Sequence, residues 1–170
     1  GAAGGIGAAI SGAYADVGAT VIVGYNRSAD RANALCASLP GRGHVTKYAP
    51  VLDSGVLQSL AHEISLDFGR LDILVNNAGV TKVVPHNDLD ALEDADIDRI
   101  FHTNVRGSFA CVRAFRSLLA DSVEGLVINI SSIAGTTAVG SNVAYCASKA
   151  AIDSMTKSLG RALAPEIRVV

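Results

Sequence analysis

The sequence has 170 residues, 49% of them hydrophobic and 18% charged, and a formal net charge of −2 at pH 7. This length suits one domain with a sizeable core, and the apolar content excludes a disordered chain. No basic block favours nucleic acid as a partner, and no apolar run is long enough to span a membrane. The three cysteines and four histidines are scattered without metal-ligand spacing, so we expect reduced thiols, a cytoplasmic location and no metal site.

The chain opens with the glycine-rich turn GAAGGIG at residues 1–7, which leads into an alanine-rich segment, 8–17, that predicts a helix. Glycines let the backbone approach a pyrophosphate closely, and the helix N-terminus adds unpaired N–H groups. The turn can be parsed as G-x-x-x-G-x-G or as G-x-x-G-x-x-G. Because Gly1 falls inside this motif and Val170 inside an apolar run, we expect the natural protein to be longer at both ends, with a strand ahead of Gly1.

The run Thr20–Tyr25 predicts a strand, and the residues after it bear on the choice of cofactor. In dinucleotide folds an acidic side chain at this point binds the ribose 2′-hydroxyl of NAD and repels the 2′-phosphate of NADP. Here Asn26, Arg27 and Ser28 follow the strand, and no acidic residue occurs before Asp30. Arg27 can pair with a phosphate, and its neighbours can donate hydrogen bonds to it. We therefore expect NADP(H) to be preferred and NAD(H) to be accepted, unless Arg27 is only a solvated turn residue.

Further strands and helices alternate along the rest of the chain. Apolar runs predict strands at Val45–Ala49, Asp72–Val75, Leu126–Ser131 and Arg168–Val170. Helical spacing predicts helices over 56–68, with Asp53 as a plausible N-cap, over 94–119 and over 145–163. Such alternation with nearly continuous apolar strands predicts an α/β fold, a doubly wound parallel sheet with helices on both faces, in one domain over residues 1–170.

Tyr145 and Lys149 are four residues apart, so they lie on one face of the last predicted helix. In isolation, such a pair is usually a surface tyrosine beside a solvated lysine. Ser132, however, follows a predicted strand, where doubly wound sheets bind ligands, and thirteen positions before Tyr145 leave room for one loop and no further element. An ammonium group stabilises a phenolate, so Tyr145 could act as a general acid–base, while Ser132 could hold a substrate oxygen. The pattern favours a small carbonyl or alcohol substrate.

Taken in order, these motifs resemble the short-chain dehydrogenase/reductase family. The parse G-x-x-x-G-I-G, the motif N-N-A-G at 76–79, Asn104, Ser131-Ser132 and the pair Tyr145 and Lys149 cover essentially the whole chain. The resemblance implies catalytic roles for Asn104, Ser132, Tyr145 and Lys149. It implies a cofactor site made of Gly1, Gly5, Ile6, Gly7, Asn26, Arg27, Ser28, Val51, Asn77, Ala78, Gly79, Tyr145 and Lys149. In the family, the lysine also binds the nicotinamide ribose, and the asparagine anchors a water that links this lysine to solvent.

The thirteen-residue spacing between Ser132 and Tyr145, together with N-N-A-G, resembles the compact branch of the family more than the sugar-nucleotide epimerases. Within that branch the loop Ile133–Ala144 looks most like that of 3-oxoacyl-carrier-protein reductases. Dehydrogenases of sugars, steroids or small alcohols share these features and stay open as alternatives. A non-catalytic dinucleotide sensor on the same fold is a further alternative, although this chain retains all four residues of the catalytic set.

One position departs from the family pattern. Many relatives carry an aspartate that binds the adenine amine just after the third strand, whereas this chain has Pro50 there. Proline cannot make that contact, but the backbone of Val51 could bind the adenine, and Asp53 fits a helix cap better. The resemblance also implies a homodimer or homotetramer that pairs the two long helices.

Overall fold

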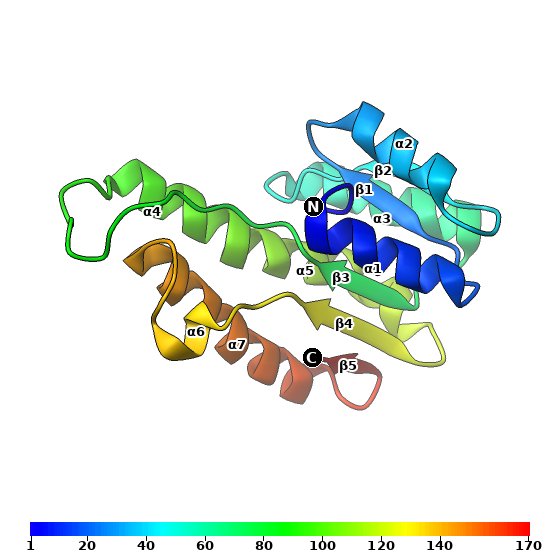
Figure 1. Ribbon diagram of the computed structural model, residues 1–170. Coiled ribbons are helices and arrows are strands. Elements are labelled where there is room, and N and C mark those ends of the chain that lie inside the picture. Colours follow the sequence, from blue (N-terminus) through cyan, green and yellow to red (C-terminus); the bar gives the residue numbers. More distant parts are fainter.

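The computed structural model describes residues 1–170 and contains five strands joined by helices (Figure 1). The strands are β1 (Ile22–Tyr25), β2 (Val45–Tyr48), β3 (Ile73–Asn76), β4 (Gly125–Asn129) and β5 (Ile167–Val169). The helices are α1 (Gly5–Asp16), α2 (Ala29–Ser38), α3 (Ser54–Phe68), α4 (Asp94–Phe101), the π-helical turn η1 (His102–Arg106), α5 (Gly107–Ala120), α6 (Ala134–Thr137) and α7 (Val143–Leu163). The predicted α/β alternation is confirmed, with element ends shifted by a few residues.

All strand pairs are parallel, but the hydrogen-bonded ladder has two parts rather than the single sheet that we expected. β1 pairs with β2, and β4 pairs with both β3 and β5. The glycine turn, and not a strand, adjoins the end of β3: the Asn77 side-chain amide donates a 2.9 Å hydrogen bond to the carbonyl of Gly1. The strand that we expect ahead of Gly1 stays a prediction.

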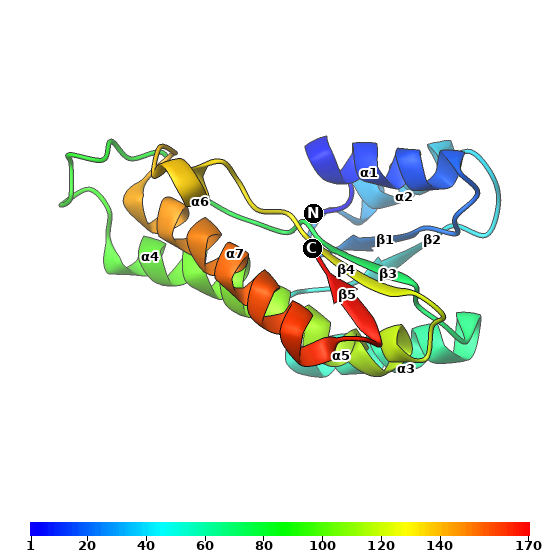
Figure 2. The same cartoon turned by 90° about the horizontal axis from the view of Figure 1, so that it is seen from below.

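Helices cover both faces of the strands (Figure 2). Two separate hydrophobic cores lie between the helices and the strands. On one face, α1 and α2 pack on β1 around Ala15, Val23, Ala32 and Leu39. On the other face, α3 and α5 contribute most of the larger core, which continues onto Val127 of β4 and Ile167 of β5. The longest helix, α7, also packs against β5 and against α4. These contacts fix the position of α7 and therefore position Tyr145 and Lys149, which lie on this helix.

The sequence did not predict two helices, α2 and α6, and the presence of α6 corrects one prediction. The segment from Ser132 to Tyr145 is not a single loop, because α6 forms one helical turn within it. The hydroxyls of Thr136 and Thr137 both donate to the carbonyl of Ile133, and Ala138 ends the turn in the left-handed region with φ 57°. Local side-chain bonds of this kind create a turn without any periodic apolar pattern. The other missed helix, α2, buries only Ala32 and therefore has a weak apolar face.

The helix predicted over 94–119 is a continuous helical run from Asp94 to Ala120, but it contains η1 in its middle. A π turn holds one more residue than an α turn and often marks a functional site. Here it contains Asn104, whose side chain is buried. No helix of the chain combines the length and the apolar character needed to cross a membrane.

Candidate active site

The predicted site residues follow the carboxyl ends of the strands. Residues 26–28 come after β1, 50–53 after β2, 77–79 after β3 and 130–132 after β4. Parallel strands present their carboxyl ends at one edge of a sheet, which is where open α/β sheets bind ligands. The polar side chains of distant segments therefore meet at a common edge.

At this edge, the glycine turn packs tightly against the segment that follows β3. A Cβ added to Gly7 would lie 2.3 Å from the carbonyl oxygen of Gly1 and 2.7 Å from the side-chain nitrogen of Asn77, so only glycine fits. Gly1 also lies close to Ala78, because a Cβ on Gly1 would lie 3.1 Å from the backbone nitrogen of Ala78. The first turn of α1 directly behind contains no acidic residue. A helix N-terminus leaves its first backbone N–H groups without partners in the helix, so the turn can present such groups to an anion.

The same segment continues toward Asn104 and Lys149. A Cβ on Gly79 would lie 3.4 Å from Oδ1 of Asn104 and 3.9 Å from Nζ of Lys149. The structure therefore places the glycine turn, residues 77–79 and Lys149 side by side along one edge. Such an extended arrangement has the shape that an elongated ligand requires.

Tyr145 and Lys149 lie on the same face of α7, as predicted. The Lys149 ammonium is 5.8 Å from the centre of the Tyr145 ring and donates a 2.7 Å hydrogen bond to the carbonyl of Ile130. Lys149 is buried, and this burial lowers the pKa of its ammonium from 10.5, while the carboxylate of Asp153 opposes the shift. The phenol oxygen of Tyr145 accepts and donates no hydrogen bond within the chain. An unpaired hydroxyl beside a buried cation is available to a ligand.

Ser132 follows β4 as predicted, but its hydroxyl is not hydrogen-bonded to Tyr145. Its Oγ accepts a 3.2 Å bond from the backbone N–H of Ala134 at the start of α6. The preceding Ser131 donates to the carbonyl of Lys149 at 3.3 Å, which ties the end of β4 to α7. The Ser132 hydroxyl retains its own proton to donate.

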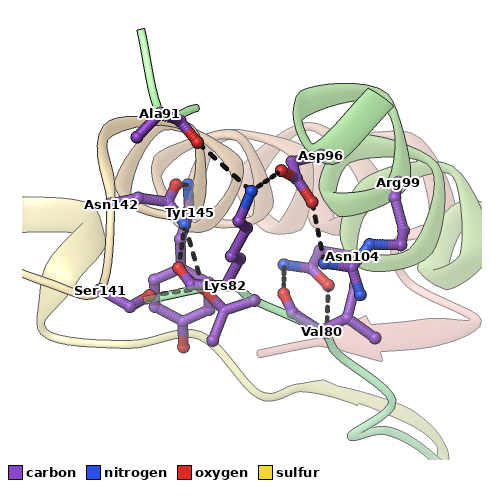
Figure 3. Close-up of polar contacts among 10 residues, drawn as sticks. Val80, Lys82, Ala91, Asp96, Arg99, Asn104, Ser141, Asn142 and Tyr145 are labelled. Atoms are coloured by element: carbon purple, nitrogen blue, oxygen red, sulfur yellow. Dashed lines mark hydrogen bonds and ion pairs between the residues drawn. The ribbon is translucent and has the colours of Figure 1, made fainter. Parts of the chain in front are cut away.

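Asn104 is almost completely buried within η1. Its side chain binds Val80 (Figure 3) and also Ser148 of α7. Its Oδ1 accepts from the N–H of Val80 at 2.8 Å, and its amide nitrogen donates to the carbonyl of Val80 at 3.1 Å and to the hydroxyl of Ser148 at 3.0 Å. The backbone carbonyl of Asn104 accepts a 2.8 Å bond from the hydroxyl of Ser108. Both N–H groups of its side-chain amide are thus engaged with protein, and the bonds to Val80 and Ser148 fix the orientation of the side chain.

The residues assigned to cofactor choice lie on the surface after β1. Asn26, Arg27 and Ser28 are exposed, and Ser28 precedes α2 without a side-chain capping bond. Arg31 in the first turn of α2 joins them: its guanidinium lies 3.2 Å from the position of a Cβ on Gly4. Sequence reasoning missed Arg31 because α2 was not predicted. Counting one helical turn from Ser28 could have found it.

After β2, the structure confirms the predicted role of Asp53, which accepts a 3.0 Å bond from the N–H of Val56 and caps α3. Pro50 and Val51 lie in the turn before it, and Val51 packs against Gly107 at the start of α5. Its contact with adenine stays a prediction.

Two further polar residues near Tyr145 were missed. Ser148 is fully buried and donates to the carbonyl of Tyr145 at 2.8 Å while it accepts from Asn104. Asn142 caps the N-terminus of α7. An asparagine just ahead of an expected helix is a capping signal, so Asn142 could have been found. Nothing in the sequence indicates the partner of Ser148.

No group of three or more histidine, cysteine, aspartate or glutamate side chains is placed to hold a metal ion. The three cysteines are free thiols. The site is therefore built from hydroxyl, amide and ammonium groups.

Comparison with known proteins gives consistent matches. A D-threitol dehydrogenase from Mycolicibacterium smegmatis is 39% identical over 161 residues, which cover 94% of this chain and 60% of that protein. A 3-oxoacyl-(acyl-carrier-protein) reductase from Staphylococcus aureus is 32% identical over 166 residues, which cover 96% of this chain and 66% of that protein. The chain thus spans less than two thirds of the length of these two curated relatives.

Structural comparison agrees. A metagenomic short-chain oxidoreductase crystallised in complex with NADP superposes with a TM-score of 0.85 at 29% identity, covering 99% of this chain and 75% of that one. This similarity supports a Rossmann-like arrangement of parallel strands and flanking helices. The short chain dehydrogenase family model matches residues 1–170. The chain belongs to the short-chain dehydrogenase family.

Proposed function

We propose that the protein is an oxidoreductase that interconverts a ketone and a secondary alcohol, with NADP(H) preferred and NAD(H) accepted as hydride carrier. One observation carries this proposal: the glycine turn, residues 77–79, Lys149 and the free hydroxyl of Tyr145 follow one another along the carboxyl edge of the strands. A dinucleotide lying along this path would have its pyrophosphate at the turn and its nicotinamide end beside Tyr145.

The residues present fit such a cofactor. The glycine turn leaves room for a pyrophosphate, and no carboxylate in the first turn of α1 would repel it. We assign Gly1, Gly5, Ile6 and Gly7 to the pyrophosphate side, Val51 to the adenine side, and Asn77, Ala78 and Gly79 to the middle of the path. When bound, the nicotinamide ring supplies or accepts the hydride.

We assign proton transfer to Tyr145. In the reductive direction its hydroxyl donates a proton to the carbonyl oxygen that becomes the alcohol, and in the oxidative direction the phenolate takes it back. Ser132, whose hydroxyl still has its proton to donate, would hold the same substrate oxygen and stabilise the charge that develops there. Lys149 stabilises the phenolate and binds the ribose, and by the family resemblance Asn104 would anchor the water that links Lys149 to solvent.

The preference for NADP(H) rests on charge. Arg27 and Arg31 flank the end of β1, neither of them forms an ion pair within the chain, and the strand ends in Tyr25 without an acidic residue. Two unpaired guanidinium groups suit a ribose 2′-phosphate, and the missing carboxylate removes the repulsion that NAD-specific folds use. The NADP complex of the metagenomic relative supports the same proposal.

Similarity to the two curated relatives favours two substrate classes. Similarity to the 3-oxoacyl-(acyl-carrier-protein) reductase favours reduction of a 3-oxoacyl thioester. Similarity to the D-threitol dehydrogenase favours oxidation of a secondary hydroxyl in a polyol, which falls within the wider group of sugar and small-alcohol substrates. From the family resemblance, we also propose that the enzyme is cytoplasmic and that it forms a homodimer or homotetramer through α4–α5 and α7.

The decisive experiment replaces only the phenolic oxygen. Tyr145→Phe in the protein that carries this chain should lower kcat by at least a hundredfold, the usual order for loss of a general acid–base, while the Kd for NADPH stays nearly constant. Absorbance of the reduced nicotinamide, followed with a 3-oxoacyl thioester and with a tetritol, measures both substrate classes. The matched control is Tyr14→Phe near the end of α1, which should leave kcat unchanged. A Tyr145→Phe variant that keeps a tenth of the wild-type kcat would contradict the assignment.

A further inference from the structure

Asn142, just ahead of α7, has a side chain that is 1% exposed and fully hydrogen-bonded. Its Oδ1 accepts a 2.7 Å bond from the backbone N–H of Tyr145. Its amide nitrogen donates a 2.6 Å bond to the carbonyl of Lys82 and a 3.3 Å bond to the hydroxyl of Thr81 (Figure 3). One buried amide therefore joins the backbone of Tyr145 to a segment 60 residues away in the sequence.

The segment that Asn142 binds is itself held in place. Val84 donates its N–H to the carbonyl of Ser141 at 2.8 Å, and the hydroxyls of Thr81 and Ser141 are hydrogen-bonded to each other. The ammonium of Lys82 binds the carboxylate of Asp96 on α4 and the carbonyl of Ala91 at 3.2 Å. Residues 80–84 are therefore held in place and can fix the position of the start of α7.

This segment also leads directly to the candidate active site. Its first residue, Val80, makes two hydrogen bonds with Asn104, and the residue before it, Gly79, lies beside Lys149. The chain 79–82 thus touches Lys149 and Asn104 at one end and Asn142 at the other. Any shift of α7 relative to residues 79–82 would move the Tyr145 phenol relative to the path that we assign to the cofactor.

We propose that Asn142 is a positioning residue for Tyr145, which fixes the phenol against residues 79–82. A serine or an aspartate could cap α7 equally well, because a helix cap needs only an acceptor. The amide of asparagine supplies an acceptor and a donor from one short side chain. The acceptor holds the N–H of Tyr145 and the donor holds the carbonyl of Lys82, so the two segments are aligned by one planar group. This inference rests on the proposed function of Tyr145.

Two substitutions separate the two roles. Asn142→Ala removes both the cap and the link to Lys82, whereas Asn142→Ser keeps a capping acceptor and loses the donor that reaches Lys82. Asp53→Ala serves as the matched control, because it removes the same kind of side-chain cap from α3, outside the catalytic residues. For each variant, kcat, the Kd for NADPH and the melting temperature are measured.

We expect Asn142→Ala to lower kcat by about tenfold to a hundredfold, as small misplacements of a catalytic group do. Its Kd for NADPH should stay within about twofold of wild type. Asn142→Ser should recover most of the melting temperature but only part of kcat, and Asp53→Ala should keep the wild-type kcat. Full kcat in Asn142→Ser would overturn the inference, because the link to Lys82 would then be unnecessary. The inference would also be overturned if the loss of kcat in Asn142→Ala were matched by an equal loss of NADPH affinity.

Hydrogen–deuterium exchange tests the link without any reaction. Asn142→Ala should speed exchange both in residues 80–84 and at the start of α7, whereas Asn142→Ser should speed it in residues 80–84 alone. Unchanged exchange in residues 80–84 of both variants would refute the link. If the wild-type protein reduces or oxidises no substrate, the proposed function fails, and the exchange result still decides whether Asn142 holds the two segments together.

Discussion

The start of α7 and the turn after β1 present their polar side chains in opposite ways. Around α7, Asn104, Asn142, Ser148 and Lys149 are buried, and no buried side-chain nitrogen or oxygen lacks a partner. After β1, residues 26–28 are exposed and form no ion pair. The first region is ordered by hydrogen bonds within the protein, whereas the exposed side chains of the second are hydrated and can exchange water for a ligand. Substitutions in the two regions should therefore affect different kinetic constants.

Apart from Tyr145→Phe, the largest effect should come from Lys149→Met, which removes the buried charge from the ordered region. We expect kcat/KM to fall by about a hundredfold, and cofactor affinity to fall more than in Tyr145→Phe, because Lys149 serves both the phenolate and the ribose. Without the ammonium, the rise of alcohol oxidation with pH should move to higher pH. Burial lowers the pKa of Lys149, so its charge costs stability below that pKa, and the melting temperature should stay the same or rise. An unshifted pH profile with normal cofactor affinity would place Lys149 outside the site.

A smaller and more selective effect is expected from Arg27→Ala and Arg31→Ala in the exposed region. A charge-assisted hydrogen bond contributes about 1.5–3 kcal/mol, so each variant should lose about tenfold or more in kcat/KM with NADPH and little with NADH. Arg42→Ala is the charge-matched control, since Arg42 lies before the amino end of β2, opposite the candidate site. Equal losses with both cofactors, or a wild-type preference for NADH, would contradict the assignment. A loss in only one variant would show which guanidinium binds the phosphate.

The smallest effect should follow Asp53→Ala, which tests a cap that has no catalytic role. Loss of a side-chain N-cap costs about 1 kcal/mol, so the melting temperature should fall by roughly 2–4 °C while kcat is unchanged. Thermal denaturation and a steady-state assay of the same sample give both values. A fall in kcat would mean that the turn at residues 50–53 contributes more to the site than its capping bond.

Sequence reasoning predicted the parts of the fold that repeat over many residues. The apolar run that became β4 and the spaced residues of α3 stand out because a buried strand or helix face needs them. Helix α2 has only Ala32 buried, and α6 is held by threonine hydroxyls, so neither produces a periodic apolar signal. The π turn in η1 was equally invisible, because it continues a helical pattern and differs only in its hydrogen bonds.

The site was predictable to the extent that its residues are chemically distinctive. Tyr145, Lys149 and Ser132 were predicted from spacing and from the place of Ser132 after a strand, and the structure puts Lys149 beside the Tyr145 ring. The partners that hold them were harder to find. Asn142 acts on Lys82, which lies 60 positions earlier in the chain, and only the packing of α7 against that segment brings the two together.

The π turn η1 also limits how this chain can change length. A π turn holds one residue more than an α turn, so deleting one residue within His102–Arg106 could restore a regular helix and leave α4 and α5 in their present register. The change would fall on the turn itself. Each residue advances an α-helix by about 100°, so the side chains within the turn would be redistributed around the helix axis, and Asn104 would lose its alignment with Val80. The turn can exchange an exposed side chain such as that of His102, yet a single-codon deletion there would break the hydrogen bonds between η1 and the segment after β3.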